Sequence, residues 1–282
     1  MSDIEQLLPR AQAYIANHDW RGRIGIDLSS ALVSPLAQGE YNLNYRVDTP
    51  RDHLVLRVNM GTQIERDDQI VYEYQALRLL EGSGVTPRPW FVDDSRQGFD
   101  TGVLLMEFLP GEPLDYARDL EAAAGLFARV HQVPVAEAGN HLIREERPLS
   151  LIYAECHGLL ERYFQSELAD PEIGAYLREV RAWAAENRRK EAYYLADPWP
   201  CVVNTEVNSG NFIANRRTGA LHLVDWEMPR WGDPSQDLAH FCSPLTTLWK
   251  TDYRMGSADK ARFIDTYKNQ LDDAHLKDTL GD

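Results

Sequence analysis

One stretch near the end of the chain, residues 204–227, constrains the fold most strongly because it sets two acids and an amide at a definite spacing. It reads NTEVNSGNFIANRRTGALHLVDWE. Glu206 is followed by Asn211, and Asp225 ends the apolar run at residues 221–224. A loop that carries Glu206 and Asn211, followed by a hairpin that returns Asp225, would bring the three side chains together. Phosphoryl transfer needs such a set, because a carboxylate must orient the incoming hydroxyl and oxygen ligands must hold magnesium.

The amino-acid sequence of this stretch and of the segment after it resembles that of a known family. NTEVNSGNFI followed by LVDWEMPRWGDPSQDLAHF is similar to the aminoglycoside phosphotransferase and choline kinase family, whose usual text is HGDLHPGNIL and then VDWE or IDFE with GDPxxDLA. The matching positions are Asn211, Asp225, Glu227, Gly232, Asp233, Pro234, Asp237 and Leu238. The resemblance implies a two-lobed α+β fold of the protein-kinase type. We place a small antiparallel-sheet N-lobe at residues 1–108 and a mostly helical C-lobe at residues 109–282.

Two positions depart from the family text. The family's His is Asn204 here, and its catalytic Asp is Glu206. Glu keeps the carboxylate but adds a methylene, and a displacement of roughly 1 Å in a positioned group can lower a rate about a hundredfold. Three outcomes stay open: a working enzyme with a compensating backbone, a slow enzyme, or a nucleotide-binding protein that has lost transfer.

Charge and composition limit the partners. The net charge of −15 argues against nucleic acid, because a phosphate backbone needs a basic face. The acidity fits either general solubility or an acidic cleft that attracts a cationic substrate. The three cysteines are widely spaced and predict neither a disulfide framework nor a zinc site. With no long apolar run and no leader pattern, a cytoplasmic protein without a membrane segment is expected, and the oligomeric state stays open.

Alternating apolar segments predict the first three strands, at residues 32–36, 43–47 and 53–58. The first turn contains only one glycine, Gly39, where a kinase glycine loop would read GxGxxG. By itself this is the pattern of an ordinary hairpin turn, but NLNYRV is similar to choline-kinase-like chains. The resemblance implies that the backbone around Gly39 and the side chains of Asn42 and Asn44 face the phosphates of a nucleotide.

The third strand, LVLRVN, has Arg57 where a kinase would hold its phosphate-pairing lysine, and the first 189 residues contain no lysine. Arginine offers a planar fork suited to phosphate oxygens, although a solvent-facing Arg57 is the alternative. The helix expected over residues 63–81 carries Glu73. The resemblance pairs Glu73 with Arg57, whereas spacing alone does not prefer it to Glu65 or Asp68.

The apolar run VLLMEF at residues 103–108 predicts a strand at a buried edge of the sheet, and the following LPGE predicts a hinge between the lobes. The resemblance places the nucleotide base against the backbone of Glu107 and Leu109. Further helices are expected over residues 3–17, 120–131, 149–168 and 171–192 and from about residue 235. The exposed faces of the two around residues 149–192 are the candidates for contacts with an acceptor.

Two residues of the C-lobe are expected to support the site. His131, at a helix end, is expected to cap or pack. Asp237, in GDPSQDLAHF, is expected to accept backbone hydrogen bonds from the catalytic loop.

These features predict a small-molecule kinase that uses ATP and Mg²⁺. Asn211 and Asp225 would hold the metal, Glu206 would orient the acceptor hydroxyl and accept its proton, and Arg57 would neutralise phosphate charge. The acceptor is expected to be small and cationic, of the amino alcohol or aminoglycoside type. A nucleotide-binding regulatory protein is the alternative, and a magnesium-dependent hydrolase is a third hypothesis. No GxxxxGK[ST] motif is present, which argues against a Walker-type ATPase.

Overall fold

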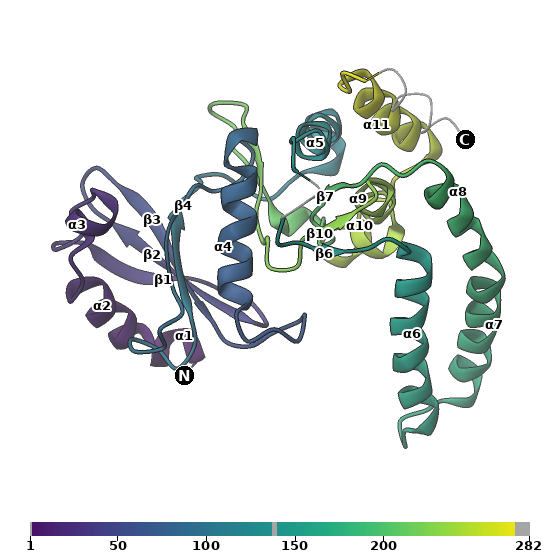
Figure 1. The fold of residues 1–282 in the computed structure, drawn as a ribbon, viewed down its shortest axis with the longest axis horizontal. Coiled ribbons are helices and arrows are strands. Elements are labelled where there is room, and N and C mark those ends of the chain that lie inside the picture. The colour runs from purple at the N-terminus through teal and green to yellow at the C-terminus, as the bar shows by residue number, and fades with distance from the viewer. Residues whose placement is uncertain (1, 137–139, 274–282) are drawn as a thin grey trace.

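The structure is a computed structural model that describes residues 2–136 and 140–273, and it has a sheet-containing N-lobe and a larger helical C-lobe (Figure 1). The N-lobe sheet is antiparallel, with strand order β1-β2-β3-β5-β4. Its strands are β1 Leu32–Gln38, β2 Asn42–Asp48, β3 His53–Asn59, β4 Pro89–Asp93 and β5 Val103–Glu107. The predicted fold class is confirmed, and the boundary after residue 108 stays a prediction.

Strand β5 lies between β3 and β4, so the prediction of an edge position for VLLMEF is wrong. Its first four residues are buried. A strand covered on both faces needs apolar side chains on both, which explains a continuous apolar run without polar alternation. The edge strand on this side of the sheet is β4, most of whose side chains are only half-buried.

The two faces of the sheet belong to different cores. Leu54, Leu56 and Val58 of β3 pack against the first three helices, while Val55 packs on the side of α4. These helices are α1 Asp3–Gln6, α2 Leu8–Ala16, α3 Trp20–Ile24 and α4 Gln69–Leu80. The sequence predicted one helix over residues 3–17, but a second helix begins at Leu8 with Pro9 in its first turn, because proline lacks the N–H that a helix interior requires.

Helix α4 begins at Gln69, six residues later than predicted. The preceding residues form a loop because side chains take their N–H groups. The Thr62 hydroxyl accepts from Ile64 and Arg66, at 3.3 and 3.0 Å, and the Gln69 side chain accepts from Gln63 at 3.0 Å. Local bonds of this kind compete with helix formation.

The C-lobe is built on α5, which spans Tyr116–His131 (Figure 1). Its other helices are α6 Pro148–Gln165, α7 Pro171–Asn187, α8 Glu191–Ala196, α9 Ser235–Phe241, α10 Pro244–Lys250 and α11 Ser257–Asn269. Its strands are β6 Ile143–Arg144, β7 Cys201–Val203, β8 Phe212–Ala214, β9 Leu221–Leu223 and β10 Arg230–Gly232. Strand β10 joins β6 and β7 in one small sheet, and β8 pairs with β9.

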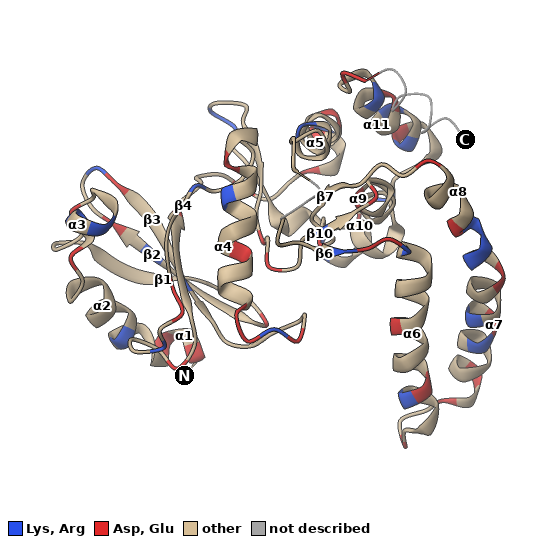
Figure 2. Cartoon of the chain, viewed as in Figure 1, with Lys and Arg blue, Asp and Glu red and all other residues tan. Residues whose placement is uncertain are grey.

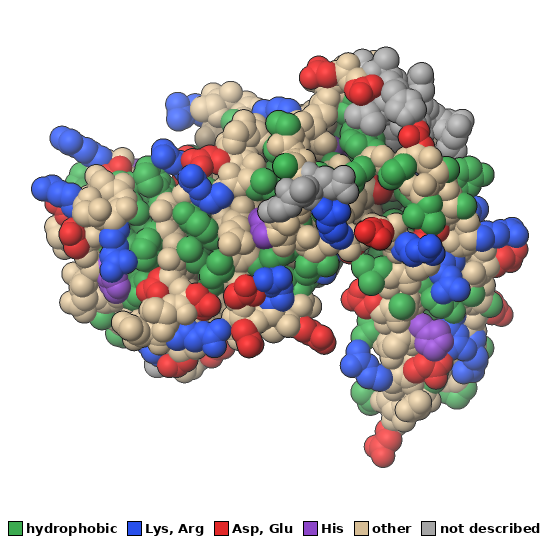
Figure 3. All heavy atoms as spheres, viewed as in Figure 1, with side chains coloured by type: hydrophobic (Ala, Val, Ile, Leu, Met, Phe, Trp, Pro, Cys, Tyr) green, Lys and Arg blue, Asp and Glu red, His purple; other side chains and the backbone are tan. Residues whose placement is uncertain are grey.

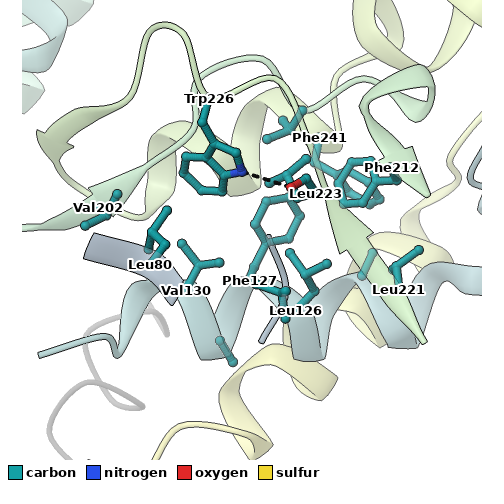
Figure 4. Packing of buried hydrophobic residues seen from close by; sticks show 14 of the residues in the cluster. Leu80, Leu126, Phe127, Val130, Val202, Phe212, Leu221, Leu223, Trp226 and Phe241 are labelled. Carbon is teal, nitrogen blue, oxygen red and sulfur yellow. Dashed lines mark hydrogen bonds between the residues drawn. The ribbon is translucent and has the colours of Figure 1, made fainter. Parts of the chain in front are cut away.

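The core of this lobe holds the hairpin that the sequence singled out. Phe127 of α5 packs edge-on against Phe212 and Phe241, and the Trp226 indole donates to the Leu223 carbonyl at 2.9 Å (Figure 4). Because these side chains are buried in the core around the β8–β9 hairpin, the polar residues beside it have a fixed support.

Helices α6 and α7 project away from the rest of the C-lobe as a pair, with an open hollow beside them (Figure 3). The helix predicted over residues 171–192 is α7, which ends at Asn187. A short 3₁₀ turn, Arg188–Lys190, separates it from α8. Both basic and acidic residues occur along α7 (Figure 2). Within residues 2–136 and 140–273, no helix combines the length and apolar character that a membrane crossing needs.

Candidate active site

The β8–β9 hairpin sets the spacing of the predicted metal residues. Phe212 lies opposite Leu223, and the Val224 N–H donates to the Asn211 carbonyl at 2.8 Å. Asn211 immediately precedes the hairpin and Asp225 follows it. The antiparallel pairing therefore returns Asp225 to the end of the hairpin at which Asn211 lies.

Three carboxylates converge at this end. One oxygen each from Glu206, Asp225 and Glu227 lies within 4.8 Å of the others. Asn211 adjoins this cluster, because its side-chain N–H donates to the Glu206 carbonyl at 2.8 Å and its own oxygen is an additional ligand type. Carboxylate and amide oxygens are the ligands that Mg²⁺ prefers, so this donor set fits the predicted ion. The sequence analysis assigned no role to Glu227. Its position two residues after Asp225 was the feature that could have indicated a place in this cluster.

Arg57 reaches the cluster from the N-lobe. Successive residues of a strand face opposite sides, so Arg57 shares with Val55 the face that packs on α4. Its side chain is only 7% exposed. Its Nη1 lies 2.6 Å from Glu73 and 2.9 Å from Asp225, and its Nε donates to Asn44 at 3.0 Å. Burial lowers the pKa of Arg57, but the carboxylates of Glu73, Asp225 and Glu227 outweigh it, and the net effect is a raised pKa.

Two N-lobe amides hold Glu227. The Asn42 side chain donates to its carboxylate, and so does Gln69, at 3.2 Å. Both amide residues are buried. The Asn42 side chain, expected at the phosphates, thus has a protein partner in this structure, while the Gly39 N–H donates to the Asn42 carbonyl at 2.9 Å and closes the turn. Contacts of Gly39 and Asn42 with a nucleotide stay a prediction.

The cluster has more negative charge than its one guanidinium balances. Burial raises the pKa of Glu206 to about 7, and the neighbouring Asp225 carboxylate acts in the same direction. Burial, followed by Asp225 and Glu73, raises the pKa of Glu227 to about 8. Arg57 opposes both shifts. Like charges that share a buried site favour protonation or a bound cation, which is the electrostatic character of a metal site.

Asp237 holds the loop at residues 204–206, which carries Glu206. This fully buried carboxylate accepts the N–H groups of Asn204 and Thr205, both at 2.8 Å. The Asn204 side chain then joins the two acid-bearing segments, because it donates to the Asp225 carbonyl at 3.0 Å and accepts the Glu206 N–H at 3.0 Å. His131 is buried against Asp237 and Tyr267, so the structural role expected for it is confirmed.

Two residues of the site have a left-handed backbone. Thr205 has a φ of 72° and Asp225 a φ of 65°. This conformation is unfavourable for residues other than glycine, and most of all for a β-branched one such as Thr. The Thr205 hydroxyl donates to the Met228 carbonyl at 3.2 Å, which adds to the bond from Asp237 in fixing this strained turn.

With this geometry in place, the comparisons with known proteins become informative. The family described as "Phosphotransferase enzyme family" matches residues 32–276. This chain belongs to the phosphotransferase enzyme family. No curated protein sequence is similar enough to count as a match.

Several solved structures share the fold of this phosphotransferase. A choline kinase from Cryptosporidium parvum Iowa II has a TM-score of 0.65 at 17% identity, covering 92% of this chain and 79% of that one. An ethanolamine kinase from Plasmodium vivax has a TM-score of 0.64 at 14% identity, covering 95% and 76%. A spectinomycin phosphotransferase in complex with ADP and spectinomycin has a TM-score of 0.54 at 14% identity, covering 91% and 79%. At these identities the likeness shows the fold.

The predicted hinge of this phosphotransferase is partly occupied by internal hydrogen bonds. The Glu107 N–H donates to the Arg88 carbonyl at 2.8 Å, and the Phe108 N–H donates to the His53 carbonyl at 3.1 Å. A nucleotide base at this segment would therefore depend on its carbonyl groups and on Leu109. The contacts of Glu107 and Leu109 with a base stay a prediction.

The helices expected to contact an acceptor border two hollows. One, of about 430 Å³, is mostly apolar and is lined by α6 and α7 residues such as Ile152, Tyr153 and Trp183. The other, of about 480 Å³, lies between α8 and β10 and is lined by residues such as Tyr194, Trp199 and Asp233. Neither is lined by Glu206, Asp225 or Glu227, so both hollows lie apart from the carboxylate cluster.

Proposed function

We propose that this protein transfers the terminal phosphate of ATP to a hydroxyl group of a small cationic molecule, of the amino alcohol or aminoglycoside type. The observation that carries this proposal is the meeting of Glu206, Asp225 and Glu227, with carboxylate oxygens within 4.8 Å of one another, beside the buried guanidinium of Arg57. Membership of a phosphotransferase family supports the reaction type.

In this proposal the acidic residues hold the metal ion, and Arg57 contributes positive charge. Asp225 and Asn211 would hold Mg²⁺, with Glu227 as a further oxygen ligand. Bound there, the ion supplies neutralisation of the charge that develops on the phosphate oxygens. Arg57 adds a fixed positive charge at the same place, and Glu73 keeps its side chain oriented through the 2.6 Å ion pair.

Glu206 would act on the acceptor. A general base is most effective when its pKa lies near the working pH, and burial beside Asp225 raises the pKa of Glu206 to about 7. Its carboxylate would accept a hydrogen bond from the acceptor hydroxyl, orient that oxygen toward the phosphorus atom, and take the proton as the new bond forms.

The preference for a cationic acceptor follows from charge. The chain has a net charge of −15, and the carboxylate cluster adds local negative potential. The solved structures that share the fold include kinases named for choline and ethanolamine, which supports an amino alcohol. Apolar side chains of α6 and α7, such as Ile152, Tyr153 and Trp183, would then provide contacts with the remainder of the acceptor.

A nucleotide-binding regulatory protein is the second candidate. The observation that favours it is Glu206 in place of the family's Asp, because a displaced carboxylate would slow the transfer step without preventing nucleotide binding.

The test is an ADP-release assay with ATP, Mg²⁺ and a panel of amino alcohols, aminoglycosides and sugars, with product phosphorylation followed by ³¹P NMR. We expect turnover with a cationic acceptor, loss of turnover in Asp225→Asn, and loss on chelation of Mg²⁺. Binding of ATP and Mg²⁺ without turnover, together with activity created by Glu206→Asp, would support the regulatory protein. A protein that binds neither ATP nor Mg²⁺ would refute both.

A further inference from the structure

Three buried side chains on one face of helix α4 contribute to holding the loop between β9 and β10, residues 224–229. Because they are three and four residues apart, the helix presents them on the same side. They are Gln69, Tyr72 and Glu73. Two of them reach the carboxylate cluster, one through Glu227 and the other through the ion pair with Arg57. The third, Tyr72, contacts the backbone of the same loop.

The Tyr72 hydroxyl joins two backbone segments that meet beside this loop. It donates to the Pro229 carbonyl at 2.5 Å and accepts the Ile143 N–H at 3.1 Å. Both groups adjoin the place where β6 and β10 pair, because Ile143 lies opposite Arg230. A hydroxyl can donate one hydrogen bond and accept others, so Tyr72 uses both capacities here. Phenylalanine would fill the same buried space but would not link the two segments.

The contact with Tyr72 fixes the far end of the loop. Two earlier carbonyls, those of Asp225 and Met228, accept hydrogen bonds from the C-lobe at 3.0 and 3.2 Å. The Pro229 carbonyl is the last one before β10 begins, and there the donor comes from the N-lobe. Tyr72 thus holds the backbone two residues beyond Glu227. The stretch that carries both carboxylates is therefore fixed from both lobes.

We propose that Tyr72 is a positioning residue that sets the loop at residues 224–229 so that Asp225 and Glu227 can hold one metal ion together. The inference rests on the proposed function, in which these two carboxylates bind Mg²⁺. This ion demands nearly ideal octahedral geometry, so its ligands must be placed accurately. Groups that orient metal ligands typically contribute about tenfold to a hundredfold in metal affinity. Loss of the Tyr72 hydroxyl would release the Pro229 carbonyl and loosen the backbone that carries the carboxylates.

The substitution Tyr72→Phe tests this inference, because it removes the hydroxyl and keeps the ring. Binding of Mn²⁺, a paramagnetic substitute for Mg²⁺, is measured by EPR in the presence of a non-hydrolysable ATP analogue. We expect the Kd for Mn²⁺ to rise roughly tenfold in Tyr72→Phe.

Tyr45→Phe is the matched control. Tyr45 is also buried, and its hydroxyl donates to the Ile4 carbonyl at 2.9 Å on the face of the sheet that packs against the first three helices. Removing this hydroxyl should change the Kd for Mn²⁺ less than about twofold, because the site is distant from the cluster. An unchanged Kd in Tyr72→Phe, or equal rises in the two variants, would overturn the proposal.

Steady-state rates add a measurement that a general loss of stability would not reproduce. In Tyr72→Phe the Mg²⁺ concentration for half-maximal rate should rise roughly tenfold, while the KM for the acceptor changes less than about twofold. Saturating Mg²⁺ should restore most of kcat, and a loss of kcat that Mg²⁺ does not restore would contradict positioning through the metal. A wild-type protein that binds Mn²⁺ but phosphorylates no acceptor would refute the proposed function alone, because the Kd values still decide the role of Tyr72.

The contact itself can be tested in the wild-type protein, so poor folding of the variant would not leave the question open. The Ile143 N–H donates to a buried hydroxyl, so its exchange with deuterium, followed by NMR, should be slow in the metal-free protein. An Ile143 amide that exchanges as fast as an amide of an unstructured peptide would overturn the contact with Tyr72, and with it the proposal.

Discussion

Replacing Glu227 by Gln is predicted to make the metal-free protein more stable at pH 8. Glu227 is only 5% exposed and faces the carboxylates of Asp225 and Glu73, so its ionised form is unfavourable in the folded protein. Glutamine has nearly the same shape and keeps a carbonyl oxygen that accepts from Asn42 and Gln69. The substitution therefore removes the charge and leaves the hydrogen bonds in place.

The magnitude follows from the pKa of Glu227, which burial and Asp225 raise from 4.5 to about 8. At about 1.4 kcal/mol per pKa unit, this difference sets an upper limit of roughly 5 kcal/mol. Because the clustered acids share protons and Arg57 takes part, we expect about 2 kcal/mol. The unfolded chain loses this proton near pH 4.5 and the folded protein near pH 8. Wild-type stability should therefore fall as the pH rises across that window.

The assay is urea denaturation of wild type and Glu227→Gln with EDTA at pH 5, 6, 7 and 8. The difference in the free energy of unfolding should be small at pH 5 and grow to pH 8. Glu191→Gln is the matched control, because Glu191 is also 5% exposed but accepts from Ser150 outside the cluster. No gain in Glu227→Gln at pH 8, or an equal gain at pH 5, would refute the reasoning. Adding Mg²⁺ should stabilise the wild type more than Glu227→Gln.

Three further predictions test other parts of the site. Arg57→Ala should lower the free energy of unfolding by about 3–5 kcal/mol, measured by denaturation, because it leaves Glu73 buried without its cation; a loss below about 1 kcal/mol would contradict this. Asp237→Asn should lower kcat at least about tenfold with little change in the KM for ATP, because one of its two loop-holding acceptors becomes a donor; an unchanged kcat would exclude this role. The pH profile of kcat/KM should rise with pH to a midpoint at or below about 7, because Glu206 must be ionised to accept a proton; activity that rises as the pH falls below 6 would count against Glu206 as the base.

The sequence predicted the features that depend on local pattern. Alternating apolar residues located β2 and β3 almost to their ends. The position of Arg57 on a strand and of Glu73 on the following helix was predicted from the resemblance, and the structure has the two side chains 2.6 Å apart. Strand alternation explains this contact, because it sends Arg57 to the side of the sheet that α4 covers.

What the sequence did not predict depends on side chains far apart in the chain. Gln69 and Glu227 are separated by more than 150 residues, and their contact exists only because the two lobes pack in one particular way. Residues 63–68 were predicted to be helical, whereas the Thr62 hydroxyl and the Gln69 side chain accept hydrogen bonds from N–H groups that a helix would use. The inner position of β5 likewise depends on strand order, which apolar content alone does not determine.

The segment from Asp225 to Pro229 is bonded on both sides. Its side chains and last carbonyl meet Arg57 and Tyr72 of the N-lobe, while other carbonyls meet Asn204 and the Thr205 hydroxyl of the C-lobe. It is therefore hydrogen-bonded to both lobes of the molecule. Separating the lobes would break these bonds. Without a ligand, the two lobes should therefore move little relative to each other until an ion competes with Arg57 for Asp225.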